Sequence, residues 1–269
     1  MQTEWSNRWR KLAGQDLMTG DIGEGQMVER WRDLARRLDS GSDPRRDPIL
    51  DFVVERLSPE MSVLDIGAGV GRWTVPLAEA ARSVTAVEPV PGMRDVLRER
   101  LARHHARNVA VVEQPWLEAD VETHDVAVAA YSMYTSPDLV AFARRMDDRA
   151  TRLCGLAMRL PAADGIIGEL SARIHGEWHD STNFIVGYNA LLEAGFAPNV
   201  FIERAPVSYW ADTSIEGAIA RARRHLRLES HEHDALIEET LRKRLTPTGD
   251  GYRWPDWMRA ALVWWEPGN

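Results

Sequence analysis

Apolar positions along the middle of the chain follow two alternating periods. Residues 63–66 form a short apolar run that stops at a glycine-rich stretch, and residues 73–81 repeat apolar side chains at helical spacing. Residues 83–87 form a second, β-branched run, which closes at Glu88. This order of strand, glycine loop, helix and strand predicts a βαβ unit, which builds a parallel sheet through a right-handed crossover.

The same alternation continues towards the end of the chain. Further strands are expected at residues 108–113, 125–130, 152–160, 199–204 and 261–265. Helices are expected around them at residues 47–57, 93–105, 139–146 and 188–194. Because helices and strands alternate, we predict an α/β fold with a doubly wound, mostly parallel seven-stranded sheet.

Helical segments outside this alternation predict a cap. Residues 1–46 hold two amphipathic stretches and then a linker of glycine, serine and proline, and we expect them to form an N-terminal helical cap. Residues 47–269 form the main domain, with insertions at about 161–187 and 211–255 that extend the cap. Helices that only pack on the domain and bury their tryptophans are the alternative, and both interpretations can hold together.

The glycines that follow the first strand have a mechanical reason. Gly67, Gly69 and Gly71 allow a sharp turn into the helix and a close approach of a ligand to the backbone. The free N–H groups of the first helical turn favour a negative or polar partner. Glu88 comes about twenty residues later, where an acid can accept hydrogen bonds from both ribose hydroxyls. The expected ligand is therefore a nucleoside with a group attached at its 5′ side.

The spacing of the glycines and one nearby acid narrow the choice of nucleoside. A dinucleotide site would show G-x-G-x-x-G, but here Arg72 follows directly after G-x-G-x-G. Asp65 precedes the first glycine by two residues, where its charge would repel a pyrophosphate but would suit an ammonium group. S-adenosylmethionine carries that ammonium group, together with a sulfonium, an adenosine and one small carboxylate.

The stretch VLDIGAGVGRW followed by VTAVEP resembles the class I S-adenosylmethionine-dependent methyltransferases. The likeness is good over residues 47–160, and it implies a Rossmann-like methyltransferase fold with S-adenosylmethionine as cofactor and S-adenosylhomocysteine as product. It places the donor at the first motif and at the ribose-binding acid, that is, at Asp65, Gly67, Ala68, Gly69, Gly71 and Glu88. A Rossmann-like domain whose loop merely turns is the alternative.

In the resembled family, the turn after the third strand contacts adenine, often through an acid or a polar side chain. Here the expected acid is replaced by Pro115 or displaced to Glu118. Trp116 is the candidate for stacking on adenine, with Leu117 beside it, and a core position for Trp116 is the alternative.

The segment after the fourth strand commonly faces the methyl donor in the resembled family. Tyr131 and Tyr134 are therefore the first candidates for contact with substrate, by stacking on it or holding its nucleophile. Shielding of the sulfonium from water is the alternative role. An ordinary phenol titrates near 10, so neither tyrosine is assigned as a general base.

A histidine pair in the first insertion is a weaker candidate. His175 and His179 are spaced to share one helical face, but the acid needed for H-E-x-x-H is one place late and Gly176 interrupts the helix. We predict no metal site. A lid that presents His175, Glu177 or His179 as a base is one interpretation, and solvated polar residues on a cap are the other.

Composition and charge limit the class of partner. The formal charge is −8, from 33 basic and 41 acidic side chains, and this argues against a nucleic-acid substrate, which needs a basic face. The single cysteine, Cys154, excludes a disulfide framework within one chain. No apolar run has the length of a membrane span, and no signal peptide is recognised, so we expect a cytoplasmic monomer or homodimer.

The sequence thus predicts an S-adenosylmethionine-dependent methyltransferase (EC 2.1.1.-) that methylates an O or N atom of a small molecule. Because a sulfonium is already electrophilic, catalysis can rest on positioning and on exclusion of water. A nucleotide-binding oxidoreductase or epimerase is one alternative, against which stand Asp65 and the missing final glycine. A non-catalytic module that binds S-adenosylmethionine is another.

Overall fold

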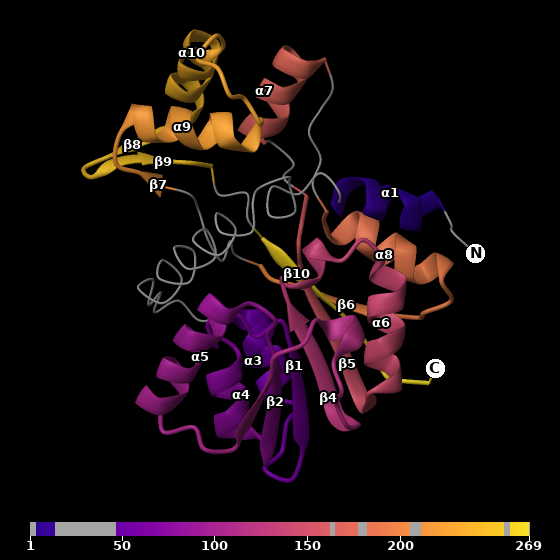
Figure 1. Ribbon diagram of the computed structural model, residues 1–269. Helices are drawn as coiled ribbons and strands as arrows, with labels where there is room; N and C mark the ends of the chain where they lie inside the picture. Colours follow the sequence, from indigo (N-terminus) through magenta and orange to yellow (C-terminus); the bar gives the residue numbers. More distant parts are fainter. Residues whose placement is uncertain are drawn as a thin grey trace. The chain divides into compact units, whose positions relative to one another are not determined.

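The computed structural model describes residues 4–13, 47–161, 165–176, 182–204, 211–255 and 259–268. The chain divides into two compact units, which Figure 1 shows coloured along the sequence. Unit 1 comprises Met1–Arg159, Thr182–Glu203 and Ala261–Asn269, and unit 2 comprises Leu160–Ser181 and Arg204–Ala260.

Unit 1 is built on a seven-stranded sheet in the order β3-β2-β1-β4-β5-β10-β6. The strands are β1 (Ser62–Ile66), β2 (Ser83–Val87), β3 (Val109–Val112), β4 (His124–Ala130), β5 (Ala150–Arg159), β6 (Asn199–Ile202) and β10 (Ala260–Trp265). β1 pairs in parallel with β2 on one side and with β4 on the other, while β6 and β10 are antiparallel. The prediction of a doubly wound, mostly parallel seven-stranded sheet is confirmed.

Helices of unit 1 lie to both sides of this sheet, with α4 and α5 on one side and α6 and α8 on the other (Figure 1). The helices are α1 (Glu4–Ala13), α3 (Pro48–Val54), α4 (Thr74–Ala80), α5 (Pro91–Arg103), α6 (Leu139–Asp148) and α8 (Phe184–Glu193). Two short 3-10 helices follow β3 and β4, at Trp116–Glu118 and Met133–Thr135. The connection order β1-α4-β2-α5-β3 is the alternation that the sequence pattern predicts.

The core of unit 1 explains why these segments take these forms. Every residue of β1 is buried, as expected for a central parallel strand that is covered on both faces. Leu97 of α5 and Val75 of α4 pack in one cluster with Ala86 of β2, and full burial of such side chains stabilises the fold by about 1.5–3 kcal/mol each. The apolar face of α1 buries Trp9 and Leu12 and packs on α6 and α8.

The N-terminal stretch is thus described only in part. α1 packs within unit 1 and buries Trp9, as expected if the N-terminal helices pack on the domain and bury their tryptophans. Residues 14–46, including the second amphipathic stretch, lie outside the described residues. An N-terminal cap stays a prediction.

Unit 2 has a hydrophobic core of its own. Its helices are α7 (Ile166–His175), α9 (Ile215–His225) and α10 (Asp234–Arg244), and its small antiparallel sheet has the order β7-β9-β8 (Ala211–Asp212, Gly251–Arg253 and Thr246–Thr248). Leu170, Ile219, Ile237, Leu241 and Trp254 are among the buried residues that its helices bring together. These three strands have two or three residues each, which is too short for a period-2 pattern, so the sequence does not predict them.

The boundaries of unit 2 differ in detail from those of the expected insertions. The sequence places the end of the first insertion near residue 187, but α8 begins at Phe184 and is capped by Asn183, whose side chain accepts from Ile185 N and Val186 N. Residues 182–187 therefore belong to unit 1. Among the helices of the described ranges, none is both long enough and apolar enough to cross a membrane.

Candidate functional site

The order of the strands sets the position of the site. The chain runs from β1 to β3 in one direction and from β4 to β5 in the other, so that β1 and β4 flank the point where the order reverses. In open α/β sheets, ligands bind outside the carboxyl ends of the strands at such a point. Ser132, just after β4, donates a hydrogen bond from Oγ to the Ile66 carbonyl at 2.6 Å, which holds the ends of β4 and β1 together.

The glycine loop lies at the carboxyl end of β1, where the strand order reverses. Three of its residues have a positive φ, which is 72° for Gly67, 58° for Gly69 and 81° for Gly71. A Cβ on Gly67 would lie 2.2 Å from the Ser132 Cβ, and one on Gly71 would lie 2.6 Å from the Leu97 Cδ1. Among the described residues, a Cβ on Gly69 would meet only the Gly67 carbonyl oxygen, at 4.0 Å. The first and third glycines are therefore required by the fold, whereas no described side chain occupies the space beside the middle one.

Glu88 reaches the same loop from the tip of β2. Its Oε2 accepts from Gly69 N and its Oε1 from Val90 N, both at 2.8 Å, and its side chain is 5% exposed. Burial raises the pKa of this carboxyl, whereas the two backbone hydrogen bonds and the charge of Arg94 act to lower it. The acid that the sequence assigns to ribose is thus held against the backbone of Gly69.

Ala68 ties the loop to the end of β2. Its N–H and that of Gly67 both donate to the Val87 carbonyl, at 3.1 and 2.7 Å, and its side chain is buried. The predicted donor residues of the loop and Glu88 are therefore brought together by β1, β2 and the turn between β1 and α4.

Asp65 lies inside β1 rather than at the surface of the site. Its carboxylate is 1% exposed and accepts from the Thr74 hydroxyl at 2.6 Å, which joins β1 to the start of α4. Burial raises the pKa of Asp65 to about 6, the Thr74 hydrogen bond opposes this rise, and the charge of Glu88 adds to it. Its contact with an ammonium group stays a prediction.

Tyr131 is the first residue after β4 and has a φ of 59°, which is uncommon for a residue other than glycine. Its N–H donates to the Ala157 carbonyl at 3.0 Å, and the Arg72 guanidinium lies 5.9 Å from its ring centroid. Burial raises the pKa of Tyr131 well above its ordinary value, with the charges of Asp47 and Glu203 adding to the rise and that of Arg72 opposing it. The phenol therefore keeps its proton at neutral pH and can donate a hydrogen bond but not serve as a base.

Tyr134 is packed as a core residue. Its ring lies 6.3 Å from that of Trp9 in a stacked arrangement, and the Arg159 guanidinium lies 4.3 Å from its centroid. The Tyr134 hydroxyl accepts a hydrogen bond from Arg159 N at 2.6 Å. These contacts give Tyr134 the role of holding the carboxyl end of β5, rather than that of an open contact surface for substrate.

Trp116 also lies in the core. It is 6% exposed, its Nε1–H donates to the Phe142 carbonyl at 3.2 Å, and the Arg145 guanidinium lies 5.2 Å from its ring. The assignment of Trp116 to adenine stacking is therefore corrected in favour of the core alternative, because α6 occupies the surroundings of the ring. Leu117, beside it, is 42% exposed and stays a predicted contact.

The histidine pair is described only in part. His175 ends α7 in unit 2, where its Nε2 lies 3.0 Å from the Leu226 carbonyl and acts as the donor, and Gly176 ends the helix with a φ of 79°. His179 lies outside the described residues. No group of three or more metal-ligating side chains occurs in the parts of the chain that the structure describes.

Three charged residues of the site are absent from the candidates that the sequence supplies. Asp47 caps α3, and its Oδ2 also accepts from Trp73 Nε1 and pairs with Arg72, both at 3.1 Å. The Asp-Pro pair at the start of α3 is a recognisable capping signal, but its link to the glycine loop spans more than twenty residues. Arg159 carries no local signal, because it is the last residue of an apolar strand.

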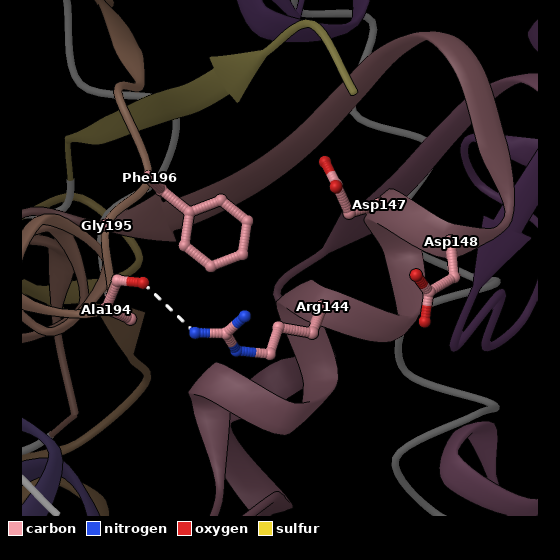
Figure 2. Close-up of a pocket in the computed structure, with 6 residues that line it drawn as sticks. All are labelled: Arg144, Asp147, Asp148, Ala194, Gly195 and Phe196. Carbon is pink, nitrogen blue, oxygen red and sulfur yellow. Dashed lines mark hydrogen bonds between the residues drawn. The ribbon is translucent and has the colours of Figure 1, made fainter. Parts of the chain in front are cut away.

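A pocket of about 320 Å³ lies elsewhere on unit 1 (Figure 2). It is lined by Arg144, Asp147, Asp148, Ala194, Gly195 and Phe196, and Arg144 donates to the Ala194 carbonyl at 3.1 Å. Asp147 and Asp148 end α6 one residue before β5 begins, so this pocket lies at the amino end of that strand, whereas the glycine loop lies at the carboxyl ends. It contains none of the predicted site residues.

The fold and the loop define the class of protein. At the carboxyl ends of β1 and β2 the sheet carries Asp65, three glycines and Glu88, in the order that the resemblance to the class I methyltransferases predicts. Residues 63–151 match the family model described as a methyltransferase domain. Residues 63–151 therefore carry a methyltransferase domain, which agrees with the predicted class of enzyme.

Individual relatives agree with this class. The chain is 36% identical over 96 residues to the mitochondrial ribosomal RNA small subunit methyltransferase of Arabidopsis thaliana, covering 35% of this chain and 25% of that protein. It is 34% identical over 92 residues to the protein-L-isoaspartate O-methyltransferase of Rhodopseudomonas palustris, covering 34% and 43%. Both matches thus span less than half of the relatives' length.

A solved structure shows the same fold. The YcgJ protein of Bacillus subtilis superposes with a TM-score of 0.52 at 14% identity, covering 80% of this chain and 96% of that chain. At this level of identity the likeness shows the fold alone.

Proposed function

We propose that the protein transfers the methyl group of S-adenosylmethionine to an O or N atom of a small molecule. The observation that carries this proposal is the Glu88 carboxylate, which is fixed on Gly69 N at the carboxyl ends of β1 and β2, beside a glycine that no described side chain covers. A methyl donor of this kind supplies an electrophilic methyl group on a sulfonium. The protein then has to bind it, orient the acceptor and exclude water.

The residues of the loop fit the donor. Each oxygen of Glu88 accepts one backbone hydrogen bond, and a carboxylate has about four acceptor positions, so two are left for ribose hydroxyls. Gly69 has no side chain, and a Cβ at this position would stand in the space that faces the ligand. Tyr131, held in a rare backbone conformation next to Arg72, is the residue that we place against the acceptor.

A small molecule is favoured over RNA as the acceptor. Relatives named as ribosomal RNA methyltransferases match between 24% and 45% of this chain, which leaves more than half of it without such a likeness. The whole chain has a formal charge of −8, whereas binding to RNA depends on cationic side chains that neutralise phosphates. Fluorescence anisotropy of a labelled ribosomal RNA fragment is therefore expected to show no binding at physiological salt.

Unit 2 is the part of the chain that we propose as a cap. Its first segment leaves the sheet after Arg159 at the carboxyl end of β5, which is the edge where the glycine loop lies. Because unit 2 is inserted in the chain at this edge of the sheet, we propose that it covers the acceptor. Hydrogen exchange of α7, α9 and α10 with and without donor and acceptor would test this role, and unchanged protection in all three helices would contradict it.

Calorimetry with S-adenosylmethionine tests the donor site. Glu88→Ala should weaken donor binding by about tenfold to a hundredfold, because one charge-assisted hydrogen bond contributes about 1.5–3 kcal/mol. Glu79→Ala removes an exposed acid of α4 and serves as the matched control, with no expected change. Equal affinities of the two variants would remove Glu88 from the site.

Transfer of label from methyl-tritiated S-adenosylmethionine tests the acceptor class. The protein is incubated with a cell extract, and label is measured separately in small molecules, RNA and protein. We expect label in the small molecules. Label in RNA alone, or donor binding without any transfer, would overturn the proposed function.

A further inference from the structure

Two arginines lie against two tyrosines at the carboxyl ends of β4 and β5. The Arg72 guanidinium is 5.9 Å from the ring centroid of Tyr131, and that of Arg159 is 4.3 Å from the ring centroid of Tyr134. Arg72 follows the glycine loop directly, whereas Arg159 comes from the end of β5. One guanidinium group therefore lies against each of the two tyrosines that follow β4.

The two guanidinium groups differ in their partners. Arg72 pairs with Asp47 at 3.1 Å and is 51% exposed. Arg159 makes no ion pair with any residue in the described ranges, and its buried Nε has no hydrogen-bond partner among them. A guanidinium stays charged in proteins, and a buried N–H without a partner is unfavourable by about 1–3 kcal/mol. An anion placed beside Arg159 would remove this penalty.

The neighbours of Arg159 hold it in place for this role. Its backbone N–H donates to the Tyr134 hydroxyl at 2.6 Å, and the Tyr134 ring is itself stacked on Trp9. Two residues earlier on the same strand, the Ala157 carbonyl accepts from Tyr131 N at 3.0 Å. Arg159 and Tyr131 thus belong to adjacent, hydrogen-bonded ends of β5 and β4.

Tyr131 supplies a second donor. Its phenol is protonated at neutral pH, as shown above, so it can donate to an oxyanion. The Tyr134 hydroxyl, in contrast, is already engaged with the backbone of β5. The Arg159 fork favours planar, bidentate anions such as a carboxylate.

We propose that Arg159 binds a carboxylate group of the methyl acceptor, which makes the acceptor a small organic acid. This inference rests on the proposed function and adds the chemical class of the substrate to it. The carboxylate is the group by which the acid is recognised and positioned, and a separate O or N atom of the same molecule is methylated. Arg159 acts in this account as a specificity-determining residue.

The test uses the full chain and a small-molecule extract separated by ion exchange into anionic, neutral and cationic pools. Each pool is incubated with methyl-tritiated S-adenosylmethionine. We expect labelled product from the anionic pool, and a loss of at least about tenfold in Arg159→Gln. Arg152→Gln is the matched control, since Arg152 is an exposed arginine at the other end of the same strand, and it should keep full transfer.

Two further measurements separate a loss of acceptor binding from a loss of folding. Donor affinity by calorimetry should be the same in Arg159→Gln as in the native protein, which shows that the variant is folded. Benzoate should inhibit transfer more strongly than its neutral match benzamide, and this comparison needs no variant.

Label from the neutral or cationic pool only, full activity of Arg159→Gln, or equal inhibition by benzoate and benzamide would overturn the inference while leaving the proposed function intact. Absence of label from every small-molecule pool would overturn both.

Discussion

The three glycines of the loop are required for two different reasons. Gly67 and Gly71 leave no room for a Cβ because Ser132 and Leu97 occupy that space, whereas no described side chain lies beside Gly69. A methyl group added at position 69 should therefore weaken binding of the donor without preventing folding.

Gly69→Ala should fold and bind the donor poorly. The substitution forces alanine into a φ of 58°, which lowers the free energy of unfolding by about 1–2 kcal/mol, and it adds a methyl group on the ligand side. Gly195→Ala is the matched control, because Gly195 has a φ of 89° with nothing within 4 Å of its added Cβ and lies away from the loop. Urea unfolding should show similar losses for both variants, and calorimetry should show weaker binding for Gly69→Ala alone.

The buried carboxyl of Asp65 gives a second prediction for a single residue. Its pKa is raised from 3.8 to about 6, so the folded protein binds more protons than the unfolded chain between these values. The contribution of Asp65 to the free energy of unfolding therefore falls as pH rises through this window and stays low above it.

Asp65→Asn removes the buried charge and keeps an acceptor for the Thr74 hydroxyl. It should raise the free energy of unfolding by about 1–3 kcal/mol at about pH 8 and change it little at about pH 4. Urea unfolding at the two pH values measures the difference. The same gain at both pH values would show that the charge of Asp65 is not the cause.

Among the helices, α3 is the one whose start is tied to the loop. Asp47 accepts from Ile49 N and Leu50 N at the start of α3, and the same carboxylate accepts from the buried Trp73 indole. One side chain thus links the helix before β1 to the helix after it.

Asp47→Ala should lower the free energy of unfolding by about 2–3 kcal/mol. Loss of an N-cap contributes about 1–2 kcal/mol, and an indole N–H left without its partner adds to this. Asp47→Asn keeps the capping oxygen but places an NH2 group, which cannot accept, where Oδ2 meets the Trp73 indole and Arg72. It should therefore lose less than Asp47→Ala by the contribution of the cap alone. Urea denaturation of the two variants gives the comparison, and equal losses would show that the cap is not the main contribution.

At the level of the whole molecule, binding of the donor should be visible as stability. A ligand that binds only the folded state at a hundredfold excess over its Kd stabilises it by about 2.7 kcal/mol. S-adenosylmethionine should therefore raise the unfolding temperature in a thermal scan, and NAD at the same concentration should not. A shift with NAD alone would favour the alternative of a nucleotide-binding oxidoreductase.

The sequence by itself determined the order of strands and helices, the place of the glycine loop and the acid at the tip of β2. These features are local, because a period of two or of 3.6 residues fixes which face of a segment is buried, and a sharp turn needs glycine wherever it occurs. For the same reason the sequence could not indicate the sheet of unit 2, whose strands are too short to show a period.

Only the tertiary structure decided which side chains meet. Trp116 and Tyr134 look alike as candidates in the sequence, and both are buried because α6 and α1, distant in the chain, pack on them. Arg72 and Arg159 join the site for the converse reason, since the parallel arrangement of β1, β4 and β5 brings the carboxyl ends of these strands to one edge. Asp47, at the start of α3, joins through its pair with Arg72. Which residues face one another across that edge depends on strand order and register, and no local pattern encodes either.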